Sequence, residues 1–424
     1  MDKLVIEGNR PLNGEVKVSG SKNATLPILA ATLLTDETCV IRNVPRLRDT
    51  LTMIKLLKSL GKEVDYVKDQ VTVASSSKKQ LNYVAEYDLV STMRGSFCVL
   101  GPLLAKLKFA KVSLPGGCVI GIRPVDLHVK GLKALGTKIE VENGYVLARA
   151  KKLKGNFVYL GGEFGSSVLA TANVLMAATL GEGETVIEAA ACEPEVEDLA
   201  NFLIAMGASI QGQGTSRLVV HGVKRLKGVH YSIGPDRIEA GSYILMAAAT
   251  RSNIILRNVN YSHLLVLIDK LEEAGVRFDR DHTTLKVKPA KSLKPISITT
   301  HPYPGFPTDL QAQFMTLMCA TPGVSLITDK VFPDRFMHIA ELNRMGANIR
   351  RDGNTAIIEG VKILHGAPVM ASDLRASAAL VIAGLAAKGQ TEIHRMYHLE
   401  RGYEDLDIKL TKLGAKVYRE KDKE

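Results

Sequence analysis

The sequence predicts an α/β protein in which one βαβαββ-like unit recurs six times. Six amphipathic helices end in the same pattern, an apolar residue, two further residues, an apolar residue and a glycine. The glycines lie 68 to 75 residues apart, and joining the two chain ends gives a spacing of 71 between the last and the first. A repeat at a fixed period indicates a repeated structural unit. The six glycines are Gly61, Gly136, Gly207, Gly275, Gly346 and Gly414.

Each unit begins with an Ala-rich helix that is apolar on every side, such as RASAALVIAGLAA at 375–387. Such a helix should be buried. A short strand follows, for example TEIH at 391–394, and then an amphipathic helix with one polar face, such as YEDLDIKLTKLG at 403–414. This second helix should lie on the outside of the domain. The closing glycine suits a helix C-terminus that needs a positive φ, and further strands complete the unit.

The two ends of the chain belong to one unit. LVIEGNRPLNGEVKVSG near the N-terminus aligns with AIIEGVKILHGAPVMAS near the C-terminus, so we expect the first strands to complete the sixth unit. A chain of 424 residues exceeds what a single core supports. We therefore predict two domains of three units each, one spanning 22–229 and the other, discontinuous, spanning 1–21 and 230–424.

The composition is that of a soluble globular protein, with 46% hydrophobic and 23% charged residues. Apolar runs stop short of the ~20 residues that a membrane span requires, and the start MDKLVIEG lacks a hydrophobic signal region, so we expect a cytoplasmic protein without membrane contact. The five cysteines form no CxxC pair and no zinc-ligand spacing, so we expect free thiols and no metal. A net charge of +11 favours anionic partners without selecting one.

Polar residues recur at or just before the starts of the buried helices. Ser, Asp and Asn there are explained by helix capping alone. Lys22 and Arg94 are not, because a cation opposes the helix dipole and requires an anion nearby. Six helix starts directed into one interdomain cleft would form an anion-binding site. The residues concerned are Lys22, Asn23, Arg94, Ser166, Ser167, Asp236, Arg237, Asp309, Asp373 and Arg375.

The stretch LPGGCVIGIRPVDLH at 114–128 places a thiol beside two glycines and an arginine. Nearby cations lower a thiol's pKa, so Cys118 is a candidate reactive cysteine. The alternative is a small buried hydrophobe, which is how we interpret Cys39, Cys98 and Cys319, each set in an apolar run.

The chain resembles the UDP-N-acetylglucosamine 1-carboxyvinyltransferase family over essentially its whole length. The matching motifs are GSKNA at 20–24, PGGC at 115–118, IGIRPVDLH at 120–128, FPTDLQAQF at 306–314, RFMHIAEL at 335–342, DLRASAAL at 373–380 and RGYE at 401–404. The resemblance implies two inside-out α/β barrels of three βαβαββ repeats each, with the active site in the cleft between them. It also implies transfer of the enolpyruvyl group of phosphoenolpyruvate to the 3′-hydroxyl of UDP-N-acetylglucosamine, with release of phosphate, at the first committed step of peptidoglycan precursor synthesis. No cofactor and no metal are implied.

The resemblance also assigns roles to residues. Cys118 corresponds to the general acid that can also add covalently to the substrate, on a loop that Gly116 and Gly117 allow to close, and Asp309 corresponds to the base for the sugar hydroxyl. Lys22, Arg123 and Arg401 correspond to the cations that hold phosphoenolpyruvate, with contributions from Arg335 and Arg375. The nucleotide sugar is assigned to Asn23, Arg94, Arg123, Pro124, Val125, Asp126, Leu127, Gly165, Ser166, Ser167, Val168, Asp309 and Val331. His128 is also assigned to substrate binding; it would lie at the base of the loop and orient it, or be a histidine with only structural hydrogen bonds.

Three positions depart from the family's usual residues. Leu169 stands where a glycine is usual, Cys192 where an arginine is usual, and Glu400 where an aspartate is common. Leu169 could narrow the nucleotide pocket, which makes Gly165, Ser166, Ser167 and Val168 the assignments most open to question.

Two other functions remain as alternatives. An enzyme acting on shikimate 3-phosphate would share the repeats, but its family lacks a PGGC loop. A nucleic-acid-binding protein would suit the charge and the basic segments KLKFAK and KKLK, but aromatic residues are only 5% and Trp is absent, which leaves few stacking platforms. We therefore expect small-molecule substrates and no nucleic acid, and the sequence leaves the oligomeric state open.

Overall fold

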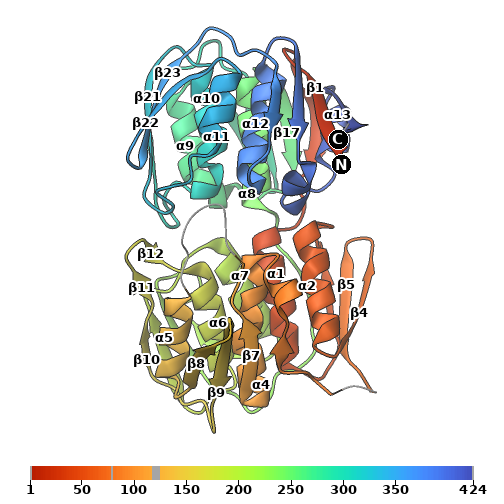
Figure 1. The fold of residues 1–424 in the computed structure, drawn as a ribbon, viewed down its shortest axis with the longest axis vertical. Coiled ribbons are helices and arrows are strands. Elements are labelled where there is room, and N and C mark those ends of the chain that lie inside the picture. The colour runs from red at the N-terminus through yellow and green to blue at the C-terminus, as the bar shows by residue number, and fades with distance from the viewer. Residues whose placement is uncertain (1, 78–79, 117–124, 423–424) are drawn as a thin grey trace. The chain divides into compact units, whose positions relative to one another are not determined.

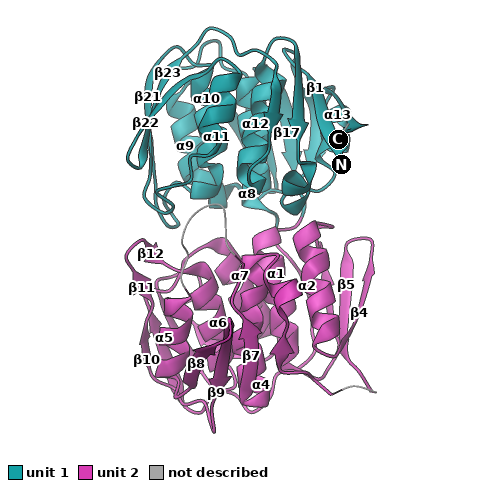
Figure 2. Ribbon diagram, viewed as in Figure 1, with its two compact units in different colours: residues 1–19, 119–121, 235–424 teal, residues 20–118, 122–234 magenta. Residues whose placement is uncertain are grey.

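The computed structural model describes residues 2–77, 80–116 and 125–422 (Figure 1). These residues form two compact units (Figure 2). Unit 1 contains the described residues of 1–19 and 235–424, and unit 2 contains those between 20 and 234. The second crossing between the units follows residue 234 rather than 229, because residues 230–232 form a strand of a unit 2 sheet.

Unit 2 contains three four-stranded sheets with one common topology. In each sheet the first two strands run parallel and the remaining neighbours run antiparallel. A two-stranded ribbon, β11 (Gly161–Gly162) and β12 (Gly165–Ser166), accompanies them. In spatial order the sheets are β16 (His230–Ser232), β3 (Cys39–Arg42), β5 (Gln70–Ser75) and β4 (Lys62–Val67); β6 (Val84–Ala85), β7 (Phe109–Ser113), β9 (Tyr145–Arg149) and β8 (Lys138–Glu142); and β10 (Phe157–Tyr159), β13 (Glu184–Glu188), β15 (Arg217–His221) and β14 (Ser209–Gln211).

Unit 1 repeats this topology in three further sheets. Six sheets of one pattern confirm that the chain is built from a repeated α/β unit. The unit 1 sheets are β2 (Asn13–Lys17), β17 (Asn253–Arg257), β19 (Thr284–Lys288) and β18 (Arg277–Asp281); β20 (Ile298–Thr300), β21 (Gly323–Asp329), β23 (Thr355–Gly360) and β22 (Asn348–Asp352); and β24 (Pro368–Met370), β25 (Gln390–His394), β1 (Asp2–Glu7) and β26 (Lys416–Lys421).

The first two strands of the chain enter different sheets. β1 lies between β25 and β26 and completes the last sheet, as the sequence predicts. β2 does not: it pairs in parallel with β17 and belongs to the sheet of the fourth repeat. We expected both strands to complete the sixth repeat, and this was wrong for β2. The chain turns between the two strands, so that β2 hydrogen-bonds to a strand of a different sheet.

The Ala-rich helices form the core of each unit, and their side chains are buried on nearly every side, which confirms the prediction from their composition. In unit 2 they are α1 (Lys22–Ala31) with η1 (Thr32–Leu34), α4 (Leu100–Leu107) after η2 (Arg94–Val99), and α6 (Val168–Ala178). In unit 1 they are α8 (Arg237–Ala249), α10 (Gln311–Cys319) after η4 (Thr308–Leu310), and α12 (Leu374–Ala386).

The amphipathic helices bury one face and expose the other. The glycine that closes each of them has φ between +86° and +104°, a conformation that side chains other than glycine rarely adopt. These helices are α2 (Arg48–Ser59), α5 (Asp126–Ala134), α7 (Pro194–Ala205), α9 (Leu265–Glu273), α11 (His338–Arg344) and α13 (Leu406–Lys412), with the short elements α3 (Tyr87–Val90), η3 (Tyr261–Leu264) and η5 (Met396–Arg401).

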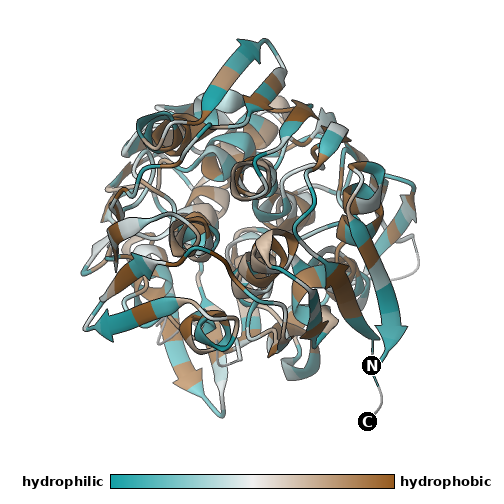
Figure 3. Ribbon diagram, turned by 90° about the horizontal axis from the view of Figure 1, so that it is seen from above, coloured by the Kyte–Doolittle hydropathy of each residue, from teal (hydrophilic) through white to brown (hydrophobic). Residues whose placement is uncertain are grey.

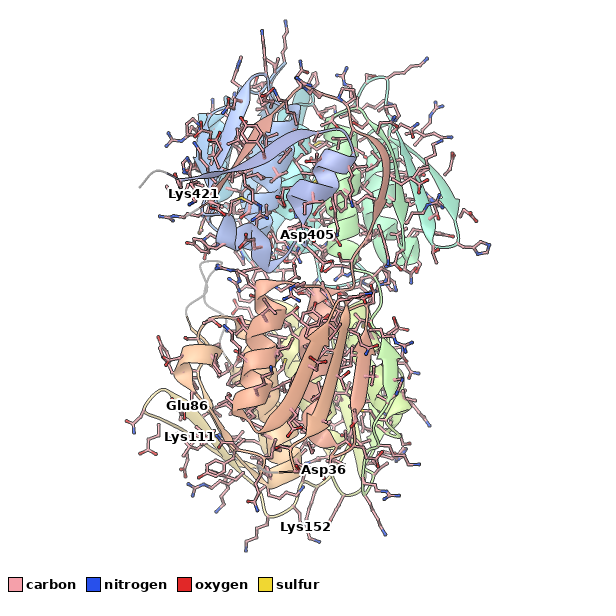
Figure 4. All side chains as sticks on the ribbon, turned by 90° about the vertical axis from the view of Figure 1, so that its right-hand side faces the viewer. Asp36, Glu86, Lys111, Lys152, Asp405 and Lys421 are labelled. Carbon is pink, nitrogen blue, oxygen red and sulfur yellow. The ribbon has the colours of Figure 1, made fainter. Side chains whose placement is uncertain are left out.

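The strands alternate polar and apolar residues, which appears as alternating teal and brown bands in Figure 3. This pattern belongs to sheets that cover a core with one face and meet solvent with the other. Charged side chains such as those of Lys152 and Lys421 project from the periphery (Figure 4). None of the helices within the described ranges has the length and apolar character that crossing a membrane requires.

Candidate functional site

In unit 1, the carboxylate of Asp309 is held by two arginines from different segments. Arg335 Nη1 donates to Asp309 Oδ1 at 2.8 Å, and Arg375 Nε donates to Asp309 Oδ2 at 3.1 Å. Asp309 lies in η4, and neither η4 nor the following helix α10 has a side-chain N-cap. The alternative interpretation of Asp309 as a helix-capping residue is therefore wrong. About a quarter of the Asp309 side chain, 27%, remains exposed, so a substrate can reach it.

Both arginines are buried, with 3% of Arg335 and 1% of Arg375 exposed. Burial alone would lower the pKa of each guanidinium, but the neighbouring carboxylates, Asp309 above all, outweigh burial and raise it. Nη1 and Nη2 of Arg375 make no hydrogen bond within the part of the chain that the structure describes. Buried donors without acceptors are uncommon in native proteins, and here they are suited to receiving an anion.

Asp373 has the capping role that was the simpler interpretation of its sequence position. Its Oδ1 accepts hydrogen bonds from the backbone N–H groups of Arg375 and Ala376 at 2.7 and 3.1 Å, at the start of α12. The same oxygen lies 3.7 Å from Arg335 Nη2. Asp373 therefore fixes the helix start that carries Arg375 and also faces the second arginine.

A buried aspartate that the sequence analysis missed organises the loops around Asp309. Asp329, at the end of β21, accepts hydrogen bonds from the hydroxyls of Thr300 and Thr308 and from the backbone N–H of Val331. Val331 is thereby fixed in a turn, and Thr308 precedes Asp309 in the chain. An aspartate at a strand end is too common a feature to be singled out without the fold.

Arg401 lies at the end of η5 in unit 1 and is half-buried. His398, one turn earlier, has a pKa lowered first by burial and then by the positive charge of Arg401. Arg401, Arg335, Arg375 and Asp309 thus all belong to unit 1, which carries the predicted base and three of the predicted anion-binding cations.

In unit 2, Lys22 is the first residue of α1 and is 7% exposed. The anion that its position requires is supplied by Asp49 in the first turn of α2, whose Oδ2 lies 3.0 Å from Lys22 Nζ. Ser21 caps α1 by accepting a hydrogen bond from the Ala24 N–H. Lys22 thus has a carboxylate partner within the protein that the sequence analysis did not foresee, and its role toward a substrate anion stays a prediction.

Asn23 and Arg94 also lie at helix starts in unit 2, in α1 and η2, and both are partly exposed. His128, in the first turn of α5, is only 2% exposed. Its Nδ1 lies 2.9 Å from Asn173 Nδ2, and its ring meets the edge of Phe97. Because the Asn173 amide also accepts from Gly101 N–H through Oδ1, Nδ2 is the donor and His128 Nδ1 the acceptor.

Burial, followed by the charge of Arg94, lowers the pKa of His128 to about 3, so the ring is neutral at ordinary pH. The contact between His128 in α5 and Asn173 in α6 favours the structural interpretation, in which His128 anchors α5, over substrate binding.

The segments assigned to the nucleotide sugar partly converge in unit 2. A Cβ added at Gly162 would lie 3.1 Å from a methyl of Leu127 and 3.4 Å from the carbonyl of Gly165, so Leu127 lies beside the β11–β12 ribbon. Ser166 ends that ribbon, Ser167 caps α6 through Ala170 N–H, and Val168 begins the helix. Val125 and Asp126 begin α5, with Asp126 exposed. Leu169 packs against the hydrophobic core of the unit.

Cys118, Arg123 and Pro124 lie outside the described residues, and their assigned roles stay predictions. Cys39, Cys98 and Cys319 are fully buried, which confirms their assignment as core residues. Burial raises the pKa of Cys98 and Cys319 to about 12 and also raises that of Cys39, so these thiols are unreactive at neutral pH. Cys192 is partly buried.

The described side chains can therefore bind anions in each unit and hold one accessible carboxylate between two guanidiniums. Within unit 1, a partly exposed carboxylate held in this way can accept a proton from a bound hydroxyl.

The family model for EPSP synthase (3-phosphoshikimate 1-carboxyvinyltransferase) matches residues 6–410. A UDP-N-acetylglucosamine 1-carboxyvinyltransferase from Methylacidiphilum infernorum (isolate V4) is 51% identical over 419 residues, covering 99% of each chain. UDP-N-acetylglucosamine 1-carboxyvinyltransferase 2 from Carboxydothermus hydrogenoformans is 53% identical over 424 residues, covering all of both chains.

Two solved structures share the fold. The enolpyruvyl transferase NikO from Streptomyces tendae superimposes with a TM-score of 0.88 at 24% identity, covering 99% of this chain and 98% of its own. EPSP synthase from Acinetobacter baumannii gives a TM-score of 0.75 at 18% identity, covering 99% and 100%. At these identities the likeness supports the fold and not the substrate.

Proposed function

The chain belongs to the UDP-N-acetylglucosamine 1-carboxyvinyltransferases, within the EPSP synthase family, and from this we infer its reaction. It transfers the enolpyruvyl group of phosphoenolpyruvate to the 3′-hydroxyl of UDP-N-acetylglucosamine and releases phosphate, in peptidoglycan precursor synthesis. The observation that carries this conclusion is identity above 50% to named transferases over the full length of both chains.

We propose that Asp309 accepts the proton of the sugar hydroxyl. Its partial exposure and its fixed carboxylate suit a general base. Arg375 would donate to the carboxylate or phosphate of phosphoenolpyruvate, because its Nη groups have no acceptor among the described residues, and Arg335 would add a second positive charge beside it. Arg401 would add a third cation from the same unit.

Lys22 is proposed to contribute a cation from unit 2 for the departing phosphate. Its pairing with Asp49 holds the ammonium at the start of α1 before any substrate arrives. Asn23, Arg94, Val125, Asp126, Leu127 and the segment 165–168 would bind the nucleotide sugar, with Val331 added from unit 1. The clustering of Leu127 with the β11–β12 ribbon supports a shared binding surface for part of this set.

Cys118 is proposed as the general acid that protonates the methylene carbon of phosphoenolpyruvate, and Arg123 as a phosphate ligand carried by the same loop. We further propose that the two units are inside-out barrels of three repeats each, with the active site in the cleft between them. This arrangement would bring Lys22 and Cys118 to the same substrate as Asp309 and Arg401. No metal or cofactor takes part in this proposal.

The proposal is tested by incubating the purified protein with phosphoenolpyruvate and UDP-N-acetylglucosamine and measuring released phosphate. Shikimate 3-phosphate, the acceptor of the related enzyme, serves as the control substrate. Phosphate release from phosphoenolpyruvate when UDP-N-acetylglucosamine is the acceptor, and not when shikimate 3-phosphate is, supports the assignment. Release only with shikimate 3-phosphate, or with neither acceptor, would refute it.

A further inference from the structure

A buried tyrosine in unit 1 lies directly behind the proposed anion-binding arginine. Tyr403 is 3% exposed, and its hydroxyl lies 2.7 Å from Ser242 Oγ in α8 and 3.2 Å from Gln313 Nε2 in α10. The Arg375 guanidinium lies over the Tyr403 ring, 5.5 Å from its centroid. Tyr403 therefore connects three core helices at the end where the proposed catalytic groups lie.

The directions of these hydrogen bonds are determined by their partners. Ser242 Oγ already donates to the backbone carbonyl of Ile238 at 2.8 Å, so it accepts from the Tyr403 hydroxyl. Gln313 Nε2 donates to the carbonyl of Asp309 at 2.8 Å, and its second proton is shared between the Tyr403 hydroxyl at 3.2 Å and Ser242 Oγ at 3.4 Å. The phenol has one donor and one acceptor bond, and both hold the ring in one orientation.

The aromatic ring of Tyr403 compensates in part for the hydrogen-bond acceptors that Arg375 lacks. Its Nη1 and Nη2 are buried and have no hydrogen-bond acceptor among the residues with described positions. A guanidinium over an aromatic face is attracted by the negative charge of the ring surface. Contact with the ring face stabilises the cation without using the N–H groups of Nη1 and Nη2, whereas Nε–H already donates to Asp309.

We propose that Tyr403 is a positioning residue for Arg375 in the transfer reaction: its ring supports the guanidinium, and its hydroxyl, fixed by Ser242 and Gln313, sets the orientation of the ring. This inference rests on the function proposed above, in which Arg375 binds phosphoenolpyruvate. In this role Tyr403 acts through Arg375 and not on the reacting atoms. The Gln313 hydrogen bond couples the same network to the main chain of Asp309.

Two substitutions separate the ring from the hydroxyl. Tyr403→Phe keeps the ring and leaves Ser242 and Gln313 bonded to the carbonyls of Ile238 and Asp309, so no buried donor loses all its partners. Tyr403→Leu also removes the aromatic face. The matched control is Tyr418→Leu, at a position in β26 of the same unit that is 37% exposed.

The measurements are kcat and KM for each substrate, with the melting temperature of each variant. We expect Tyr403→Leu to raise the KM for phosphoenolpyruvate about tenfold, as loss of a desolvated cation–π contact would. We expect Tyr403→Phe to raise it about two- to threefold, and Tyr418→Leu to leave it unchanged. The KM for UDP-N-acetylglucosamine should stay within about twofold in every variant, because Arg375 is proposed to bind phosphoenolpyruvate. A general loss of structure would instead raise the KM for both substrates.

An unchanged KM for phosphoenolpyruvate in Tyr403→Leu, or equal rises for both substrates, would overturn the proposal. If Tyr403→Leu does not fold, Tyr403→Phe is used instead: an unchanged KM for phosphoenolpyruvate in that variant, or equal rises for both substrates, would overturn the proposal. Wild-type activity is measured first, and its absence would refute the proposed function alone. In that case the rise in melting temperature on adding phosphoenolpyruvate replaces KM, and an equal rise in wild type and Tyr403→Phe would overturn the role of Tyr403.

Discussion

The ammonium of Lys22 and the carboxylate of Asp49 form a buried ion pair, 3.0 Å apart, at the start of a core helix in unit 2. Breaking a buried pair by removing one partner leaves an uncompensated charge and costs about 3–5 kcal/mol. We expect Asp49→Asn to lower the free energy of unfolding by about this amount, measured by denaturant titration. The double variant Asp49→Asn with Lys22→Met should lose less than the sum of the two single changes. Additive losses would show that the two charges do not stabilise each other.

Asp309→Asn removes the proposed base and changes the side chain's shape little. We expect kcat to fall by about 10²- to 10⁴-fold, the usual contribution of a general base, with little change in the KM for UDP-N-acetylglucosamine. Asp334→Asn provides the control, since Asp334 is exposed and pairs with Arg351 in the same unit. A wild-type rate in Asp309→Asn would assign the proton transfer to another group.

The resemblance to the family implies that the epoxide fosfomycin alkylates the loop cysteine, so we expect it to modify Cys118 and none of the other four cysteines. Cys39, Cys98 and Cys319 are buried with raised pKa values, and Cys192 also has a pKa raised by burial, so none of them is a ready thiolate at neutral pH. Peptide mass mapping locates the adduct. Cys118→Ser should abolish both labelling and most of the turnover, and labelling that persists in this variant would contradict the assignment.

Acidification should destabilise the protein through His128. Its pKa is about 3 in the folded protein and about 6.5 when unfolded, so the unfolded chain gains a proton as the pH falls below 6.5 while the folded ring stays neutral. Stability is fully present above pH 6.5 and declines toward pH 3, by about 3 kcal/mol from this group at pH 4.5. His338, with a pKa of about 4, adds in the same direction.

The contribution of His128 is measured as the difference in unfolding free energy between pH 7 and pH 4.5. This difference should be smaller in His128→Gln than in the wild type. It should be unchanged in His282→Asn, because the side chain of His282 is 95% exposed. Equal pH dependence in wild type and His128→Gln would contradict the role given to burial.

Leu169→Gly restores the residue usual in the family. Because Leu169 lies in α6 and packs against the core, we expect a loss of about 1–2 kcal/mol in stability, from lower helix propensity and lost apolar burial. Affinity for UDP-N-acetylglucosamine, measured by calorimetry, should change by less than about twofold. A tenfold gain in affinity would show that Leu169 obstructs the nucleotide site after all.

The repeats could be predicted from the sequence because each one uses the same local physics. A helix without a polar face must be buried, and Gly61 or Gly414 ends a helix where φ is positive. Pairing between distant segments could not be predicted in the same way. Nothing in the pattern around Asp49 identifies it as the partner of Lys22, and similar strand patterns did not reveal that β2 pairs with β17.

Motifs in the sequence identified the candidate site residues, but contacts that only the fold creates could not be identified in this way. Asp309, Arg335 and Arg375 lie in one cluster although up to 66 positions separate them in the chain. Tyr403 and Gln313 lie within the motifs RGYE and FPTDLQAQF, but the sequence assigned neither of them a role, and Asp329 lies outside every motif. Their importance comes from hydrogen bonds across helices and loops, which a linear pattern does not record.

The position of β1 between β25 and β26 affects how the chain matures during synthesis. β1 pairs with residues 390–393 and 416–421, which are synthesised almost four hundred residues after it. Unit 2 can fold while translation continues, whereas residues 2–17 must wait without their sheet partners. Delayed or truncated translation products would therefore present an open strand edge to other chains, the kind of surface from which aggregation begins.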